Sequence, residues 1–382
     1  MLHRFHLTIA LVLGLLLAAC GSGPDATDTA VADPDGGEGA VENSDDEPAE
    51  SVSTSTSSTT VVEVEETPDV GAALAGLTEL QSYRIEIFSG QRLISNALGV
   101  NSVAELDLEH PSTVTEVTPD GTHSRVDLTA ALGGLIDPSL DPIALEMWVG
   151  DEQIIVDTTS YQTLVDLDPS GDLGPFRPGV AFIDLAVAAE IEPEILVGSI
   201  GGSSVDLQTL GRQLPSVVND LVKVESDPIV LVGDAIYTDV LEAMGTDARQ
   251  MAYGAAGGVA LTIDLDPEVL GAFYLDFYRS LVIDVAITLR SDGSVESIYY
   301  EADLSDLWGR IFADTTLITG VSEAERAEAI VAFADTIWTL ESLTRFEPIS
   351  SLTIPHPPAD AEDRTEEYVN FLVNSGVLEA DS

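Results

Sequence analysis

The sequence predicts an α+β fold whose larger part is an antiparallel β-sheet. Short segments in which apolar and polar residues alternate follow one another from residue 83 to residue 165, with turn residues between them. An apolar, alanine-rich stretch, residues 182–200, then has the spacing of helices. On either side of Asp292-Gly293, two segments in which apolar and polar residues alternate are predicted to be strands. Because strand follows strand in the first part, the pattern favours an antiparallel meander over a parallel βαβ series.

The first part of the folded region is predicted to contain strands and turns. Pro119-Asp120-Gly121 and Gly150-Asp151 supply turns between neighbouring alternating segments. The predicted strands are residues 83–88, 103–108, 113–117, 124–128, 144–149, 154–156 and 163–165.

The middle of the chain is predicted to be largely helical. Residues 182–200 are expected to form one or two short helices, and residues 207–224 another that is broken near Pro215. Residues 267–281 follow Asp266, a favourable N-cap, and place a proline at the first helical position. The apolar side chains of this helix share one broad face, formed by Val269, Leu270, Phe273, Phe277 and Leu281.

The last part is predicted to mix strands and helices. Residues 283–289 and 295–304 form the clearest hairpin of the chain. Ser322 and Glu325 match a capping box, which predicts a helix that ends near residue 333. Further expected elements are an extended segment at 338–354, which the prolines of 355–358 stop, and a short terminal helix capped by Asp363 with Glu366.

The N-terminal residues are predicted to direct export. A basic start that includes Arg4 precedes the apolar run 7–17, which is shorter than the ~20 residues that a membrane-spanning helix needs. The run ends in Leu17-Ala18-Ala19-Cys20, and Cys20 is the only cysteine of the chain. This tetrapeptide resembles the lipobox of bacterial lipoproteins, which implies cleavage before Cys20 and attachment of diacylglycerol to its thiol. The alternative is an ordinary signal peptide followed by a chance cysteine.

The chain is therefore expected to have three parts, with a signal peptide at residues 1–19. Residues 20–67 contain almost no large apolar residue and no basic residue, so they cannot bury enough surface to offset the entropy of ordering. We expect them to form a disordered acidic tether that is lipid-anchored at Cys20. Residues 68–382 have the apolar content of a single globular domain.

The composition is strongly acidic, with 67 Asp and Glu residues against 14 Lys and Arg residues and a net charge of -53. Such a surface repels phosphate, so nucleic acid is not expected as a partner. Because anionic lipid head groups are repelled too, the membrane contact is expected to run through acylated Cys20. Two explanations of the composition stay open, namely a saline habitat and a GC-rich genome.

No motif of known catalytic chemistry is present, and we expect neither an enzyme nor a bound cofactor or metal. His110, His123 and His356 have no partner at metal-site spacing. The segment from Asp166 to Asp172 copies the first half of a calcium loop, but Arg177 stands where such a loop has a bidentate Glu, so a chance turn is favoured over a weak calcium site. A distant carboxylate pair of the glycosidase kind stays open, although an aromatic content of 6% is low for such a groove.

Three segments carry a resemblance to a known family. They are residues 77–84 (LTELQSYR), residues 147–156 (MWVGDEQIIV), and the hairpin LRSDGSV at 289–295 with an extended, proline-terminated segment at 346–358 downstream. The order of these segments, over about residues 74–359, resembles the LolA and LolB lipoprotein carriers, and especially actinobacterial lipoproteins of the LppX and LprG type. This chain is longer, with the 322–333 helix as an insertion. The resemblance implies a strongly curved antiparallel sheet, an open half-barrel, with helices covering its concave face around a cavity for acyl chains.

The sequence thus favours a cell-envelope lipoprotein that binds or carries a lipid or another apolar ligand between sheet and helices. The alternative is a non-enzymatic structural or sensory lipoprotein that acts by contact with another envelope protein. Either protein would be exported and anchored to the outer face of the cell membrane. The residues expected to line the ligand pocket are Phe182, Leu185, Leu196, Phe273 and Phe277, for each of which a place in the core is the simpler interpretation.

Overall fold

The computed structural model describes residues 72–73, 76, 80–97, 99–129, 141–150, 152–167, 173–186, 207–244, 248–249, 251–253, 256, 267–318, 321–349 and 352–374. All of these residues belong to one compact unit. The predicted signal peptide, Cys20, the predicted tether and Leu196 lie outside the described residues.

Within the described residues, 13 strands form one open, mostly antiparallel sheet, as the alternating segments predict. Strands β13 and β7 form its one parallel pair. The two edge strands of the path, β13 and β8, do not pair with each other. In spatial order the strands are β13 (Glu362–Asp363), β7 (Val180–Asp184), β6 (Gln153–Asp157), β5 (Ala144–Val149), β4 (Gly121–Asp127), β3 (Thr113–Thr118), β1 (Tyr83–Ser95), β12 (Ile337–Pro348), β11 (Val295–Asp303), β10 (Val282–Leu289), β9 (Ile229–Ile236) and β8 (Asn219–Ser226), while β2 (Val100–Ala104) also pairs with β1.

The centre of the sheet joins the first strand of the chain to its last long strand. Strand β1 pairs with β12 in continuous register from Tyr83 opposite Pro348 to Ile94 opposite Ile337. The meander β3 to β7 extends from β1 on one side, and β11 to β8 extend from β12 on the other. The two halves of the sheet therefore meet at a pairing between segments that are far apart in the sequence.

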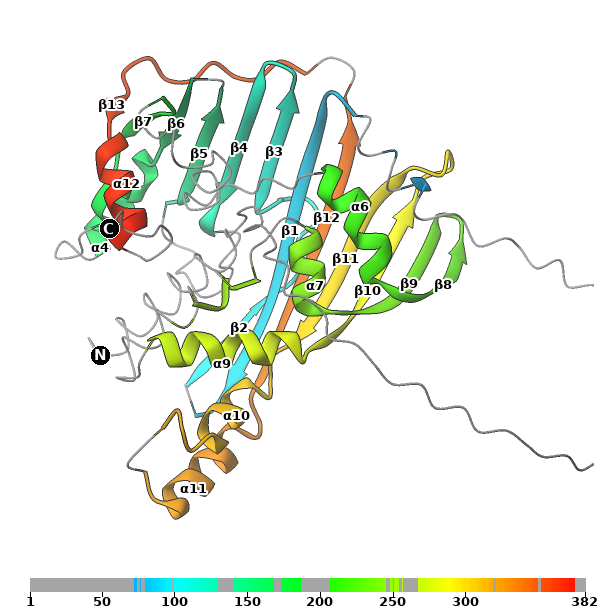
Figure 1. Cartoon of the computed structure of the whole chain (residues 1–382), viewed down its shortest axis with the longest axis vertical. Helices are drawn as coiled ribbons and strands as arrows, with labels where there is room; N and C mark the ends of the chain where they lie inside the picture. The colour runs from blue at the N-terminus through cyan, green and yellow to red at the C-terminus, as the bar shows by residue number, and fades with distance from the viewer. Residues whose placement is uncertain are drawn as a thin grey trace, which may run out of the picture. The chain divides into compact units, whose positions relative to one another are not determined.

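The helices lie at three places (Figure 1). Figure 1 shows α6 (Leu207–Val217), α7 (Tyr237–Ala243) and α9 (Pro267–Arg279) on one side of the sheet, in front of β1, β12, β11 and β10. Helix α12 (Thr365–Asn374) contacts β7 near the opposite edge. The remaining helices are α4 (Gln162–Leu167), the 3-10 turns η3 (Thr159–Tyr161) and η4 (Gly174–Phe176), and the contacting pair α10 (Leu307–Ala313) and α11 (Glu323–Phe333).

The structure confirms several elements that the sequence predicts from local signals. Helix α9 begins at Pro267, and the hairpin of β10 and β11 turns through Gly293, whose φ of 84° suits a glycine. Helix α11 has the predicted capping box, in which the Ser322 side chain accepts from the Glu325 N–H and the Glu325 carboxylate accepts from the Ser322 N–H.

Four local predictions are wrong. Of the strand predicted at 103–108 only the first two residues are in a strand, because β2 spans Val100–Ala104. The strand predicted at 163–165 is helix α4, which continues the turn of η3 and is closed by a 2.8 Å hydrogen bond from Gln162 to Asp166. The helix predicted from residue 182 is strand β7 at its start, because Ala181 and Ile183 alternate into the core. The helix predicted over 207–224 ends at Val217, and the rest of that range belongs to strand β8.

Candidate functional site

One face of the sheet carries two separate apolar clusters. The first, here called the α9 cluster, contains buried residues of α6, α7, α9 and α10 together with those of β1 and β9 to β12. The second, here called the α12 cluster, contains buried residues of β4 to β7 and Tyr368 of α12. Helices therefore cover parts of one sheet face at two places, and each cluster is closed by its own helices.

Buried hydroxyl groups lie on the same face between the two clusters. Ile85 of the α9 cluster pairs with Thr115, Thr115 with Ser124, and Ser124 with Met147 of the α12 cluster. Directly paired residues share a face, so these four side chains form one row across the sheet. Thr115 and Ser124 are each only 2% exposed, and their hydroxyl oxygens are 3.0 Å apart in a hydrogen bond. The face thus presents two apolar regions with a neutral polar band between them.

The structure brings together two of the five residues that the sequence predicts for the pocket. Phe273 and Phe277 both belong to α9, where Phe277 is buried in the α9 cluster and Phe273 packs against it. Leu185 packs against the α12 cluster instead. Phe182 pairs with Ile155 and belongs to neither cluster, because its neighbour Ile183 is the residue of β7 that points into the α12 cluster. Leu196 lies outside the described residues.

The opposite face of the sheet carries a pocket that the sequence did not indicate. Residues 352–361, here called the crossing segment, have no regular secondary structure and run from the end of β12 across the sheet to β13 (Figure 1). Below the crossing segment lies a pocket of about 400 Å³, whose lining includes Trp148 and Ile155. The indole N–H of Trp148 donates to the carbonyl of Pro355 at 3.0 Å. The sequence predicts only that the prolines of residues 355–358 end an extended segment.

A histidine lies beside this pocket between two carboxylates. The His123 ring is 5.0 Å from the Trp148 ring, and its Nδ1 is 3.5 Å from a carboxylate oxygen of Glu116. Its Nε2 is 3.7 Å from a carboxylate oxygen of Glu146. Arg84 neutralises Glu116 from the other side, with Nη2 and Oε1 2.7 Å apart. Among the described residues, no group of three or more His, Cys, Asp or Glu side chains is arranged to hold a metal ion.

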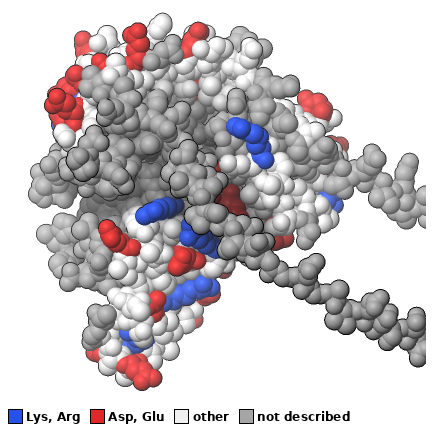
Figure 2. Space-filling model, in the orientation of Figure 1, with Lys and Arg blue, Asp and Glu red and all other residues white. Residues whose placement is uncertain are grey.

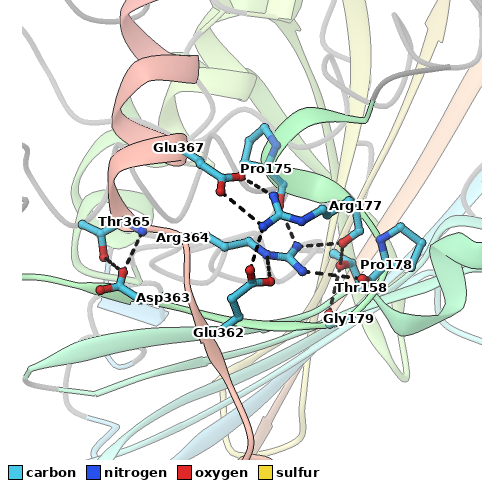
Figure 3. Close-up of polar contacts among 10 residues, drawn as sticks. All are labelled: Thr158, Pro175, Arg177, Pro178, Gly179, Glu362, Asp363, Arg364, Thr365 and Glu367. Carbon is cyan, nitrogen blue, oxygen red and sulfur yellow. Dashed lines mark hydrogen bonds and ion pairs between the residues drawn. The ribbon is translucent and has the colours of Figure 1, made fainter.

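A buried arginine fastens the end of the crossing segment to the sheet edge (Figure 3). Arg364 is 3% exposed. Its Nη1 donates to the carbonyls of Pro175 at 3.0 Å and Arg177 at 2.7 Å, and its Nε donates to Glu362 at 3.0 Å. Its backbone N–H donates to the carbonyl of Phe182 at 3.1 Å. Arg364 therefore supplies hydrogen-bond donors to two carbonyls of the loop before β7.

The two carboxylates next to this arginine in the sequence, Glu362 and Asp363, are exposed. Hydrogen bonds from Arg364, followed by those from Arg177, lower the pKa of the Glu362 carboxyl below its ordinary value of 4.5. The backbone N–H and hydroxyl of Thr365 lower the pKa of the Asp363 carboxyl in the same way. Because a lowered pKa in the folded protein means that folding favours the ionised carboxylate, these contacts stabilise the attachment above the ordinary pKa.

We expect the attachment to weaken in acid. The stability that ionised Glu362 adds is present above its ordinary pKa of 4.5 and is lost as the pH falls through the lower folded-state pKa. Urea unfolding should therefore find Glu362→Gln less stable than the parent protein at pH ~7, with the difference vanishing near pH ~3. Glu366→Gln, on the same segment but without an ion pair among the described residues, is the control. A difference for Glu362→Gln that is the same at both pH values would contradict the assignment.

The charge distribution and the remaining sequence motifs add no second site. Figure 2 shows basic side chains as separate groups on the face seen there, without a continuous basic patch among the described residues. In the part of the chain that the structure describes, no helix has both the length and the apolar character to cross a membrane. Of the calcium-loop-like segment, Asp166 is described, in helix α4, while residues 168–172 lie outside the described residues.

Comparison of the chain with models of known protein families finds no match, and comparison with curated protein sequences finds none either.

Proposed function

We propose that this protein is a non-enzymatic cell-envelope lipoprotein that binds or carries a lipid or another apolar ligand. In this proposal Cys20 is acylated and holds the protein at the outer face of the cell membrane. The sheet curves around the α9 cluster, helices α6, α7 and α9 cover its concave face, and the ligand lies between sheet and helices. No cofactor takes part.

The observation that carries the proposal is the division of the helix-bearing face into two apolar clusters. A protein of this size that only needed a core would gain most from one continuous cluster. Here the α9 and α12 clusters are separated by the buried hydroxyl row of Thr115 and Ser124, on a sheet that is open at both edges. Apolar surfaces interrupted by a few fixed polar groups are typical of small-molecule sites. The acyl anchor that the sequence predicts would keep such a site close to its lipid source.

The test is a pair of matched phenylalanine variants that lie on opposite faces of the sheet. Phe273 and Phe182 are both half-buried, but only Phe273 packs against the α9 cluster. The full chain carrying Cys20→Ser, purified without detergent, should yield lipid on extraction and bind a pyrene-labelled fatty acyl probe. Because a charge in an apolar site is costly, Phe273→Asp should weaken probe binding at least tenfold while Phe182→Asp leaves it unchanged.

The outcomes separate the two functions that the sequence left open. The ligand-carrier function would be rejected if both variants bound the probe equally. It would also be rejected if the parent protein yielded no extracted lipid and bound no probe. One observation then favours the contact protein: Val222 and Val224 of edge strand β8 are 60% and 56% exposed. Exposed apolar residues on an unpaired edge strand suit docking to another protein.

A further inference from the structure

Four buried side chains around the α9 cluster carry hydrogen-bond donors without a partner among the described residues. They are Gln91 on β1, Tyr274 on α9, Trp308 on α10 and Trp338 on β12, with exposed fractions of 9%, 1%, 6% and 4%. Buried donors without acceptors are rare in folded proteins, and each one costs free energy. Four of them in one region of the molecule therefore need an explanation.

Two of the four donors lie together on the neighbouring strands β1 and β12. Gln91 pairs with Leu340 and Leu93 pairs with Trp338, so Gln91 and Trp338 are diagonal neighbours on one face of the sheet. At that spacing long and aromatic side chains reach each other. The donor groups of these two side chains, the amide N–H and the indole N–H, thus belong to the same part of the α9 cluster.

The other two donors belong to helices of the same cluster. The backbone N–H of Leu304 donates to the carbonyl of Trp338 at 2.7 Å, and Trp308 of α10 follows four residues after Leu304. Helix α9 touches α10 through Phe277, whose ring lies 5.0 Å from the Arg310 guanidinium. Tyr274 lies one helical turn before Phe277 and is buried in the same cluster. Burial raises the pKa of its hydroxyl, which therefore stays a donor.

The donors select an acceptor without charge. An amide N–H, two indole N–H groups and a phenol are all neutral, and an anion buried among them would lose its hydration without gaining a counter-ion. Arg310, on the same helix as Trp308, is exposed and donates to the hydroxyl of Ser280 at 3.2 Å. A carbonyl oxygen of an ester or ketone, in contrast, has lone pairs for two donors and loses less hydration on burial.

We propose that Gln91, Tyr274, Trp308 and Trp338 form a subsite that binds the uncharged carbonyl group of an acyl ester carried in the α9 cluster. The subsite rests on the proposed ligand-binding function and adds a chemical selection to it. The apolar part of the ligand contacts the surrounding cluster, and its carbonyl oxygen accepts two of the donors that the protein leaves free, for which Gln91 and Trp338 are neighbours on the sheet. An alkane fills the same apolar space and leaves the donors unpaired.

The experiment compares three pyrene probes on the full chain carrying Cys20→Ser. The probes are dodecylpyrene, the methyl ester of pyrenedodecanoic acid, and the free acid. We expect the ester to bind more tightly than both others. Gln91→Leu and Trp338→Phe, which remove the two neighbouring donors, should each weaken ester binding roughly fivefold, which corresponds to the free energy of one neutral hydrogen bond, without changing alkane binding. Trp148→Phe is the control, because that indole already donates to Pro355 on the opposite face.

Thermal unfolding of the empty protein gives a second readout. Tyr274→Phe removes an unpartnered oxygen, so its midpoint should equal or exceed that of the parent, whereas Trp148→Phe should lower it. Equal binding of ester and alkane, with no effect of the variants, would mean that the donors form hydrogen bonds to buried water only. That result would overturn the subsite and leave the proposed carrier function in place. Tighter binding of the free acid would overturn the selection for an uncharged group. If none of the probes binds, carrier and subsite both fail.

Discussion

Replacing Arg364 by methionine is expected to lower the free energy of unfolding by about 3–5 kcal/mol, the cost of removing one partner from a buried charged network. Methionine keeps much of the apolar stem but removes the Arg364 donor from the carbonyls of Pro175 and Arg177, of which the Arg177 carbonyl keeps the Thr158 hydroxyl as a second donor. The same change frees Glu362 from its buried partner. Urea unfolding of the full chain measures the effect, and limited proteolysis should then cut first near the crossing segment.

The matched control lies beside it in the structure (Figure 3). Arg177 also contacts Glu362, and it contacts Glu367 as well, but its side chain is 39% exposed. An exposed ion pair contributes at most about 1 kcal/mol, so Arg177→Met should change the stability little. If the two variants lost equal stability, burial of the guanidinium would not be the reason for the strength of this attachment.

The Cys20→Ser variant is expected to lose its lipid anchor entirely. Thioether formation requires the cysteine thiol, and a second attachment by basic residues is opposed by the net charge of -53. Fractionation of cells grown with an alkyne-labelled fatty acid should find the parent protein labelled and in the membrane. The variant should be unlabelled, and found as uncleaved precursor or as released protein.

Arg4→Gln serves as the control, because it changes the basic start of the predicted signal but keeps the thiol. Protein that is exported by this variant should still be labelled. If labelling and membrane retention persisted without Cys20, the proposal that the protein is a lipoprotein anchored at Cys20 would be wrong. The proposed ligand site on the α9 cluster would still be tested separately by the binding experiments.

Elements with strong local signals could be predicted from the sequence. The hairpin of β10 and β11 alternates strictly around Asp292-Gly293, and α11 begins with a capping box whose groups lie within four residues of one another. In both cases the contacts that stabilise the element join residues close together in the sequence. The local sequence pattern is therefore enough to predict them. The apolar face of α9 was predictable for the same reason, and it placed Phe273 and Phe277 together, although Val269, predicted for the same face, is 45% exposed.

Features that depend on distant residues could not be predicted in this way. Residues 180–184 are a strand because β6 pairs with them on one side and β13 on the other, which local spacing does not reveal. The mistaken helix also misplaced the pocket, since in a strand Ile183 faces the α12 cluster and Phe182 does not. The Arg364 attachment joins positions that are nearly two hundred residues apart, and the pairing of β1 with β12 joins positions that are still farther apart. The local sequence pattern offers no signal for either contact.

The pairing of β1 with β12 also fixes the order in which the protein can mature. A chain threaded N-terminus first through an export channel delivers Tyr83 long before its partner Pro348. Until then β1 has β2 and β3 as neighbours but lacks the strand on its other side. If the protein is exported as proposed, the half-sheet β1 to β7 would wait outside the membrane without a neighbour on one side of β1 and with an exposed apolar face, the state in which a newly exported protein depends most on chaperones. Closing so long a loop is slow, which makes the arrival of residues 337–348 the step that ends this vulnerable period.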